Sequence, residues 1–315
     1  MITESIPFIS EKIVFSKNDT IRIKVTNRCP FQCNFCHHEG NINGKDLILD
    51  DYLIEGLNKC RAELNLSQIH LTGGEPASYP FCTAFIRKAV TLGFTVKMTS
   101  NGQFPSGLLE ELKDAGLHGI NFSIHTLNPI KLGALQFPPK NFEWGIRALE
   151  NQLKNLMRAR AIGLSVKINT VVQNDSDIID IINFCKSENI ALRILDDLNP
   201  HSLSVQRIIE ILSSMKSIVD GTNLFENASG YSYDITSGDG FKFKVKGIRK
   251  HILRSLCGDC RVRDDCKEWF YGIRLEQSEE KAVVRLCLHR QGSPAVQTFE
   301  EFFSSGQFLE LQGKK

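Results

Sequence analysis

The sequence predicts an α/β protein whose parallel strands curl into a partial (β/α)6 barrel. Six strand patterns, each followed by a helix pattern, fill about two thirds of the 315 residues. Strands that alternate with helices through short connections form parallel sheets. Right-handed crossovers curl such a sheet, and six units are too few to close an eight-stranded barrel.

The predicted strands are short, rich in β-branched residues and bounded by glycine or polar residues. The first, residues 21–26 (IRIKVT), alternates apolar and polar side chains, as a strand with one buried face does. The other five are predicted at residues 68–72, 94–99, 119–125, 165–172 and 191–196.

Helices are predicted where apolar residues recur three or four positions apart, as Leu53 and Leu57 do after a capping Asp50 or Asp51. These helices cover residues 50–64, 80–92, 106–115, 143–162, 176–187 and 202–219. Residues 128–139 contain proline and glycine and are predicted to form a loop.

The pattern changes near residue 220. Residues 231–245 alternate on both sides of a Gly-Asp-Gly turn, which predicts a β-hairpin. A cysteine-rich segment at 257–287 and a helix at 299–311 follow. We expect an N-terminal extension, a barrel, and a C-terminal region packed on the open mouth of the barrel, at residues 1–20, 21–219 and 220–315.

The composition is that of an ordinary globular protein. Lys and Arg number 38 against 36 Asp and Glu, for a net charge of +2, and 42% of residues are hydrophobic. This argues against a disordered chain and, because no basic excess exists, against a DNA-binding protein. The sequence has neither a signal peptide nor an apolar stretch long enough to span a membrane, so we expect a cytoplasmic protein.

Seven of the ten cysteines fall into two groups. In a reducing compartment, grouped cysteines indicate a metal or cluster site rather than disulfides. The other three, Cys60, Cys82 and Cys185, lie within helix patterns and are expected to be small buried hydrophobic residues.

The first group, Cys29, Cys33 and Cys36, has the spacing C-x3-C-x2-C directly after the first strand. In a barrel, the loops after the strands form the face that carries chemistry. Three thiolates can hold three irons of a [4Fe–4S] cluster and leave the fourth iron open. The alternative is a zinc site with His37 or His38 as fourth ligand, although zinc motifs more often use CxxC pairs.

The second predicted strand ends in the sequence LTGGEP. Gly73 and Gly74 allow a ligand to approach the backbone closely, and Glu75 can accept hydrogen bonds from an ammonium group. This second motif lies beside the cysteine loop, because neighbouring parallel strands end at the same edge of the sheet.

These motifs resemble the radical S-adenosylmethionine (SAM) superfamily, and most of all its GTP 3′,8-cyclases of molybdenum-cofactor biosynthesis. The resemblance extends over about residues 21–200 and, through the later cysteines, to about residue 290. Its matching stretches are IRIKVTNRCPFQCNFC, IHLTGGEP, MTSNG, INFSIHTLNP, VKINTVV and LRIL. The resemblance implies a TIM-like partial barrel of the radical SAM type with a C-terminal auxiliary-cluster appendage.

The resemblance also implies roles for individual residues. Cys29, Cys33 and Cys36 would ligate the cluster, whose open iron SAM would chelate. Phe35 would pack on adenine. The remaining SAM-binding residues would be Gly73, Gly74, Glu75, Ser100, Asn101, Ser123 and Leu198. An external one-electron donor of the flavodoxin or ferredoxin type would drive cleavage of SAM to a 5′-deoxyadenosyl radical, which abstracts hydrogen from a small-molecule substrate.

The second group comprises Cys257, Cys260, Cys266 and Cys287. By spacing alone, a structural zinc ribbon and an iron–sulfur cluster are equally good interpretations. The resemblance implies an auxiliary [4Fe–4S] cluster, held in the cyclases by three cysteines with one iron open to substrate. A fourth ligand, Cys266, would close that position.

The implied substrate-binding residues are Arg22, His70, Thr99, Lys167 and Arg274. Arg22 and Lys167 resemble basic residues that contact GTP in the cyclases, although solvated charges at strand ends are the alternative. His70 and Gly272 stand where the cyclases have arginine. The sequence therefore favours a related phosphorylated nucleotide or nucleotide sugar in a biosynthetic pathway over GTP.

Two further differences separate the chain from the cyclases: His125 replaces an acidic residue, and the C-terminal LQGKK lacks a Gly-Gly tail. The alternatives are the GTP 3′,8-cyclase reaction itself, a radical SAM peptide maturase and a non-catalytic zinc protein. Peptide maturases often carry an N-terminal peptide-binding domain, and only about 20 residues precede the first strand here. These features leave the oligomeric state open.

Overall fold

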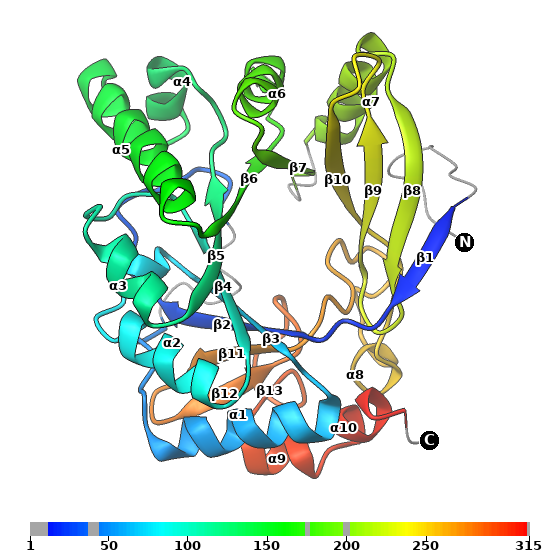
Figure 1. The fold of residues 1–315 in the computed structure, drawn as a ribbon. Coiled ribbons are helices and arrows are strands. Elements are labelled where there is room, and N and C mark those ends of the chain that lie inside the picture. The colour runs from blue at the N-terminus through cyan, green and yellow to red at the C-terminus, as the bar shows by residue number, and fades with distance from the viewer. Residues whose placement is uncertain (1–11, 37–43, 174–176, 198–201, 314–315) are drawn as a thin grey trace.

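Six parallel strands form the central sheet of the computed structural model, which describes residues 12–36, 44–173, 177–197 and 202–313 (Figure 1). They pair side by side in chain order. They are β2 (Thr20–Thr26), β3 (Gln68–Gly73), β4 (Thr95–Ser100), β5 (Leu117–Ser123), β6 (Ser165–Val171) and β7 (Ala191–Leu195). The sheet curls without closing, because β2 and β7 each pair outward with further strands. The predicted partial barrel is therefore confirmed.

Helices that connect the strands cover the outer side of the curled sheet (Figure 1). They are α1 (Asp51–Leu64), α2 (Cys82–Thr91), α3 (Leu108–Asp114), α5 (Phe142–Ala161), α6 (Ile178–Ser187) and α7 (Ser204–Ser214). Asp50 caps α1 as predicted, because its carboxylate accepts a hydrogen bond from the Leu53 amide at 2.9 Å. Among the described residues, none of the helices combines the length and apolarity needed to cross a lipid bilayer.

The inner side of the barrel is polar because side chains alternate along each strand. On β2, Ile21 and Ile23 are buried in the core, whereas Arg22 between them is half-buried. Paired residues on neighbouring strands share a side of the sheet, and Arg22 pairs with His70, which pairs with Lys97. The same alternation repeats along the other barrel strands and gives an inner wall rich in cations.

Within the barrel, two of the sequence predictions for local structure were wrong. The expected loop at 128–139 contains α4 (Pro129–Ala134), which starts because the Asn128 side chain accepts hydrogen bonds from the next turn. The expected helix at 202–219 ends at Ser214, since Lys216 has a φ of 50° and Ile218 starts a strand.

The predicted hairpin is confirmed as β9 (Gly230–Thr236) paired antiparallel with β10 (Lys242–Ile248). It extends the barrel sheet, because β10 pairs in parallel with β7. Beyond β9 lie β8 (Ile218–Phe225) and β1 (Ile13–Ser16). The domain boundary at residue 220 falls within β8 and stays a prediction.

The opposite edge of the sheet is also extended by the C-terminal region. Strand β11 (Arg274–Gln277) pairs in parallel with β2, and β12 (Ala282–Arg285) and β13 (Val296–Gln297) follow in antiparallel order. The C-terminal region thus extends both edges of the barrel sheet, through β10 beside β7 and through β11 beside β2 (Figure 1).

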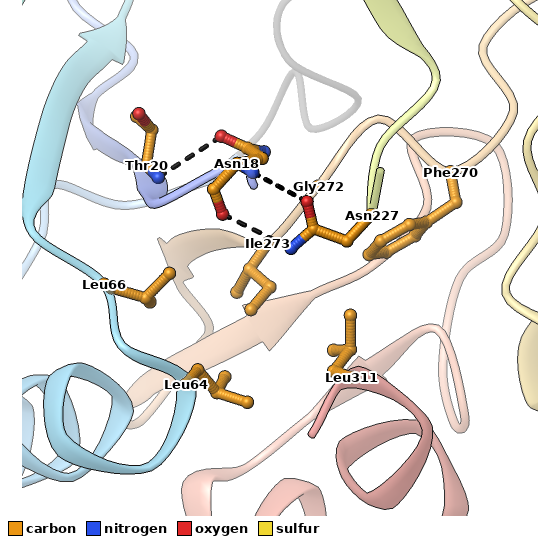
Figure 2. A pocket seen from close by; sticks show the side chains of 9 residues that line it. All are labelled: Asn18, Thr20, Leu64, Leu66, Asn227, Phe270, Gly272, Ile273 and Leu311. Atoms are coloured by element: carbon orange, nitrogen blue, oxygen red, sulfur yellow. Dashed lines mark hydrogen bonds between the residues drawn. The ribbon is translucent and has the colours of Figure 1, made fainter. Parts of the chain in front are cut away.

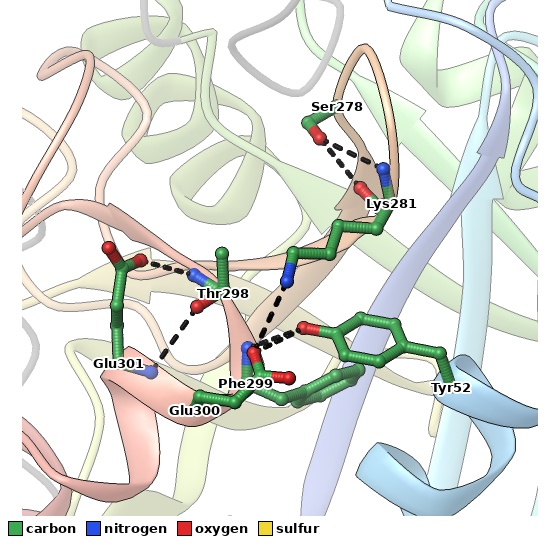
Figure 3. Close-up of polar contacts among 7 residues, drawn as sticks. All are labelled: Tyr52, Ser278, Lys281, Thr298, Phe299, Glu300 and Glu301. Atoms are coloured by element: carbon green, nitrogen blue, oxygen red, sulfur yellow. Dashed lines mark hydrogen bonds and ion pairs between the residues drawn. The ribbon is translucent and has the colours of Figure 1, made fainter.

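The last helices anchor this region on α1, as Figure 3 shows. The expected single helix at 299–311 is divided at Ser304–Ser305 into α9 (Phe299–Phe303) and α10 (Gly306–Leu311). The Tyr52 hydroxyl donates to Glu300 at 2.8 Å and accepts from the Phe299 amide at 3.0 Å. Gly56 admits the Phe299 ring, since a Cβ there would lie 2.2 Å from it.

A small pocket lies at the base of the sheet, where Asn18 and Asn227 tie the N-terminal strand to the turn after β8 (Figure 2). The backbone N–H of Asn18 donates a hydrogen bond to the side-chain oxygen Oδ1 of Asn227 at 2.7 Å. The lining residues carry neither a charge nor a thiol, so this pocket is not a candidate active site.

Candidate active site

The loop after β2 presents the first three cysteines at the carboxyl edge of the sheet. Cys29 and Cys36 are exposed and Cys33 is half-buried. Backbone hydrogen bonds fasten this loop to the segment after α4, from Asn34 to Leu135 at 2.9 Å and from Phe137 to Gln32 at 2.8 Å. The short helix that the sequence analysis missed therefore helps to hold the cysteine loop.

Gly73 and Gly74 support the same loop from β3. Gly73 has a φ of 140°, and a Cβ there would lie 2.3 Å from the Thr26 carbonyl oxygen. A Cβ on Gly74 would lie 2.3 Å from the Arg28 carbonyl oxygen. The group that packs closely against these two glycines is therefore the backbone that leads into Cys29. Their contact with SAM stays a prediction.

Glu75 is fully buried, and this burial raises the pKa of its carboxyl to about 7. The carboxylate caps the short helix η2 (Pro76–Ser78) by accepting from the Ala77 amide at 3.1 Å. It also accepts from the Asn101 amide at 2.6 Å. Glu75 therefore couples the end of β3 to the end of β4.

Two other predicted SAM-binding residues lie around this junction. The Ser100 hydroxyl accepts from the Gly102 amide at 2.9 Å, and the Ser123 carbonyl accepts from the Gln152 side chain at 3.0 Å. The Phe35 and His125 rings form a T-shaped pair with centroids 4.9 Å apart, and packing of Phe35 on adenine stays a prediction.

Three of the residues named from the sequence, Leu198, His37 and His38, lie outside the described parts of the chain. The roles assigned to them therefore stay predictions.

The donor set on the loop fits an iron–sulfur cluster. Cys33 is half-buried, and loss of solvation raises the pKa of its thiol to about 11 when no metal is bound, whereas a metal ion takes cysteine as the thiolate. Within the described ranges, no three His, Cys, Asp or Glu side chains converge as ligands of one metal ion. A [4Fe–4S] cluster takes one cysteine at each iron, so the three thiols of this loop could ligate three of its irons.

A group of cations faces the barrel interior around Tyr271. The Arg22 guanidinium carbon lies 5.7 Å from the centre of the Tyr271 ring, and the Lys246 nitrogen lies 4.1 Å from it. Lys246 also donates a hydrogen bond to the Tyr271 hydroxyl. Arg193 on β7 is close enough to repel both Arg22 and Lys246. Burial lowers the pKa of Arg193 and of Lys246, because water solvates their charges poorly there.

Lys167 adds a further cation to this wall. Burial, together with repulsion from Arg193, Lys97 and Lys244, lowers its pKa to about 8. Two of the predicted substrate residues, Arg22 and Lys167, therefore both lie close enough to Arg193 for their positive charges to repel it.

The other predicted substrate residues have partners within the protein. The Arg274 guanidinium forms a buried ion pair with Glu268 at 3.2 Å. The His70 ring nitrogen Nε2 and the Thr99 hydroxyl are hydrogen-bonded at 2.7 Å. Contact of these three residues with substrate stays a prediction.

The sequence analysis missed Arg193, Lys246 and Tyr271. Arg193 and Lys246 each alternate with buried apolar residues, as Arg22 does, and that pattern was available in the sequence. Nothing in the local sequence marks Tyr271, which reaches the barrel only because β11 pairs with β2.

The second group of cysteines lines a single hollow beside α8 (Arg254–Cys257). Cys257, Cys260, Cys266 and Cys287 are all half-buried and all contribute to its wall. The sulfur of Cys266 accepts from the Trp269 amide at 3.2 Å and that of Cys287 from the Arg290 amide at 3.5 Å. The structure therefore brings all four predicted ligands together around one space.

Comparisons with known proteins show which family this chain resembles. The family model described as the Radical SAM superfamily matches residues 23–185. GTP 3′,8-cyclase of Aquifex aeolicus is 31% identical, with 77% of this chain and 78% of that relative covered. GTP 3′,8-cyclase of Campylobacter fetus is 28% identical, with 78% and 77% covered.

Solved structures agree on the fold. The structure titled native anSMEcpe with bound AdoMet has a TM-score of 0.54 and 15% sequence identity, and covers 93% of this chain and 82% of that one. With the cysteine loop at the carboxyl edge of an open parallel barrel, these matches show that the chain is an enzyme of the radical SAM superfamily.

Proposed function

We propose that this enzyme holds a [4Fe–4S] cluster on Cys29, Cys33 and Cys36 and acts on a small, phosphorylated, nucleotide-like substrate inside the barrel. When bound, the cluster and SAM supply a 5′-deoxyadenosyl radical that abstracts hydrogen. An external one-electron donor of the flavodoxin or ferredoxin type provides the electron. The chain itself binds and orients the substrate and excludes water from the reaction.

The observation that carries the substrate assignment is the convergence of Arg22, Lys167, Arg193 and Lys246. Bringing like charges together out of water is costly, and an anionic ligand offsets that cost. The curated relatives are named for action on GTP, which is also a phosphorylated nucleotide. Membership of an enzyme superfamily contradicts the alternative of a non-catalytic zinc protein.

A substrate screen tests this assignment. Nucleotides and nucleotide sugars carrying deuterium on the sugar are incubated with SAM and reductant, and deuterium is measured in 5′-deoxyadenosine. GTP and a set of peptides form the comparison arms. We expect transfer from a phosphorylated nucleotide and poor transfer from GTP, because His70 and Gly272 replace arginines of the cyclases. Transfer from peptides alone would contradict the proposal, and efficient use of GTP would assign the cyclase reaction instead.

Substrate binding should weaken in alkaline solution. Lys167 has a pKa of about 8 and is therefore protonated below that pH. Burial alone would raise the pKa of Tyr271, but the positive charges of Lys246 and Arg22 lower it to about 8. Raising the pH removes the lysine charge and makes the tyrosine negative, and both changes disfavour an anion. We expect kcat/KM for the substrate to fall above about pH 8, while substrate-free cleavage of SAM stays level. A level kcat/KM up to about pH 9 would contradict this assignment.

We further propose that Cys257, Cys260, Cys266 and Cys287 hold an auxiliary [4Fe–4S] cluster. Four cysteines around one hollow provide a ligand for every iron. Such a cluster has no position for substrate, so it would serve in electron transfer or as a structural link rather than in substrate binding.

The auxiliary cluster should therefore have an electron paramagnetic resonance (EPR) spectrum that substrate does not alter. In the Cys266→Ala variant we expect one iron to become accessible, so that substrate or added cyanide changes the spectrum. Cys185→Ala, at a buried cysteine far along the chain from this segment, is the matched control. A change induced by substrate in the unmodified enzyme would show that Cys266 is not a ligand.

A further inference from the structure

Two side-chain amides donate hydrogen bonds to sulfur atoms of the first cysteine group. The Asn101 Nδ2 lies 3.3 Å from the Cys29 sulfur, and the Gln136 Nε2 lies 3.8 Å from the Cys33 sulfur. Both residues come from other parts of the barrel, Asn101 from the end of β4 and Gln136 from the segment after α4. Gln136 also forms an isolated β-bridge with Cys33.

The orientation of the Asn101 amide follows from its surroundings. Its Oδ1 accepts from the Gln103 backbone amide at 2.9 Å, which leaves the NH2 group directed at Cys29. Its backbone is held on both sides: Glu75 accepts from its N–H at 2.6 Å, and Gln152 donates to its carbonyl at 2.9 Å. The donor to Cys29 is therefore fixed in place by three independent contacts.

Gln136 is oriented in the same way. It is 2% exposed, and its Oε1 accepts from the Gln32 backbone amide at 2.8 Å. This contact directs the NH2 group at Cys33 and at the Leu132 carbonyl, 3.4 Å away. A reversed amide would place oxygen against both the carbonyl and the thiolate, so the observed orientation is the stable one.

We infer that Asn101 and Gln136 are positioning residues that raise the reduction potential of the cluster held by Cys29, Cys33 and Cys36. A donor near a ligating sulfur stabilises negative charge on the cluster, and reduction by one electron adds one negative charge without breaking a bond. The reduced state gains more from these hydrogen bonds than the oxidised state. The electron comes from an external one-electron donor, and loss of either amide makes this transfer less favourable.

This inference concerns the ligands of the cluster alone and does not depend on the identity of the substrate. It rests on the proposed placement of the cluster on the three cysteines. Its test therefore uses the enzyme without substrate and reads a potential rather than turnover.

The experiment is an EPR-monitored redox titration of the reconstituted enzyme with Asn101→Leu, Gln136→Met and both together. The signal that changes when SAM is added identifies the cluster with an open iron and separates it from the auxiliary cluster. We expect each single variant to lower the midpoint potential and the double variant to lower it most. A tenfold loss in the equilibrium constant for reduction, which we expect of the double variant, corresponds to about 59 mV.

Gln103→Leu is the matched control, since it removes a neighbouring amide that donates to the Ala148 carbonyl at 2.8 Å rather than to sulfur. If Asn101→Leu fails to hold a cluster, Asn101→Asp keeps the acceptor for Gln103 while losing the donor, and the potential should still fall. Potentials of the Asn101 and Gln136 variants equal to those of the unmodified enzyme and of Gln103→Leu would overturn the inference. If the three cysteines held no cluster, the signal that responds to SAM would be missing from the unmodified enzyme as well.

Discussion

Replacing Cys29, Cys33 and Cys36 together by alanine is expected to remove one of two clusters and to abolish reductive cleavage of SAM. The three thiols lie on one loop, and their thiolates would be the protein ligands of that cluster. Iron content should fall from about eight to about four atoms per chain. Formation of 5′-deoxyadenosine with dithionite as reductant should fall to the level of the enzyme-free reaction.

The control for this variant is Cys185→Ala, which changes a buried cysteine of α6 that is not part of either group. It should keep both its iron and its activity. If the triple variant still produced 5′-deoxyadenosine, the radical would arise elsewhere and the assignment of this loop would be wrong.

The Lys167→Ala variant should raise the KM for the true substrate at least about tenfold. A charge-assisted contact contributes roughly 1.5–3 kcal/mol, and a factor of ten requires about 1.4 kcal/mol. Lys167 is half-buried on the inner wall beside Arg193, so its charge acts on a ligand in the barrel and not on the solvent. Cleavage of SAM without substrate should change little, because the expected contact is with substrate.

Lys154→Ala is the matched control, since Lys154 is an exposed lysine of α5 on the outer side of the barrel. Its KM should equal that of the unmodified enzyme, and Lys167→Arg should recover most of the loss because the charge is retained. An unchanged KM in Lys167→Ala would remove the support for an anionic substrate.

The barrel could be predicted because its signals are local. Alternation along β2 and the Asp50 cap of α1 depend on residues within a few positions of each other. The position of Cys29 at the active edge follows directly, since it lies just beyond the first barrel strand. The prediction failed where tertiary contacts decide. Strand β8 forms because it pairs with β9, whereas the sequence assigned its first two residues to the end of a helix and the rest to no element.

The same difference between local sequence signals and tertiary contacts applies to the residues of the site. Arg22 and Lys167 could be found from alternation and resemblance, but Tyr271 lies about 250 residues after Arg22 and meets it only through the pairing of β11 with β2. The sequence also did not predict which side-chain amides donate hydrogen bonds to the cysteine sulfur atoms. Asn101 was expected to contact SAM, and the hydrogen bond from Gln136 depends on a helix that the sequence did not predict.

The most direct test of the central claim is the production of 5′-deoxyadenosine by the unmodified enzyme after anaerobic reconstitution. The enzyme is incubated with SAM and dithionite, and iron, zinc and nucleoside are measured in the same sample. We expect about eight irons and little zinc per chain, with 5′-deoxyadenosine formed in an amount that depends on the enzyme. A chain that binds zinc at both cysteine groups, or that holds its iron and releases no 5′-deoxyadenosine, would contradict the account.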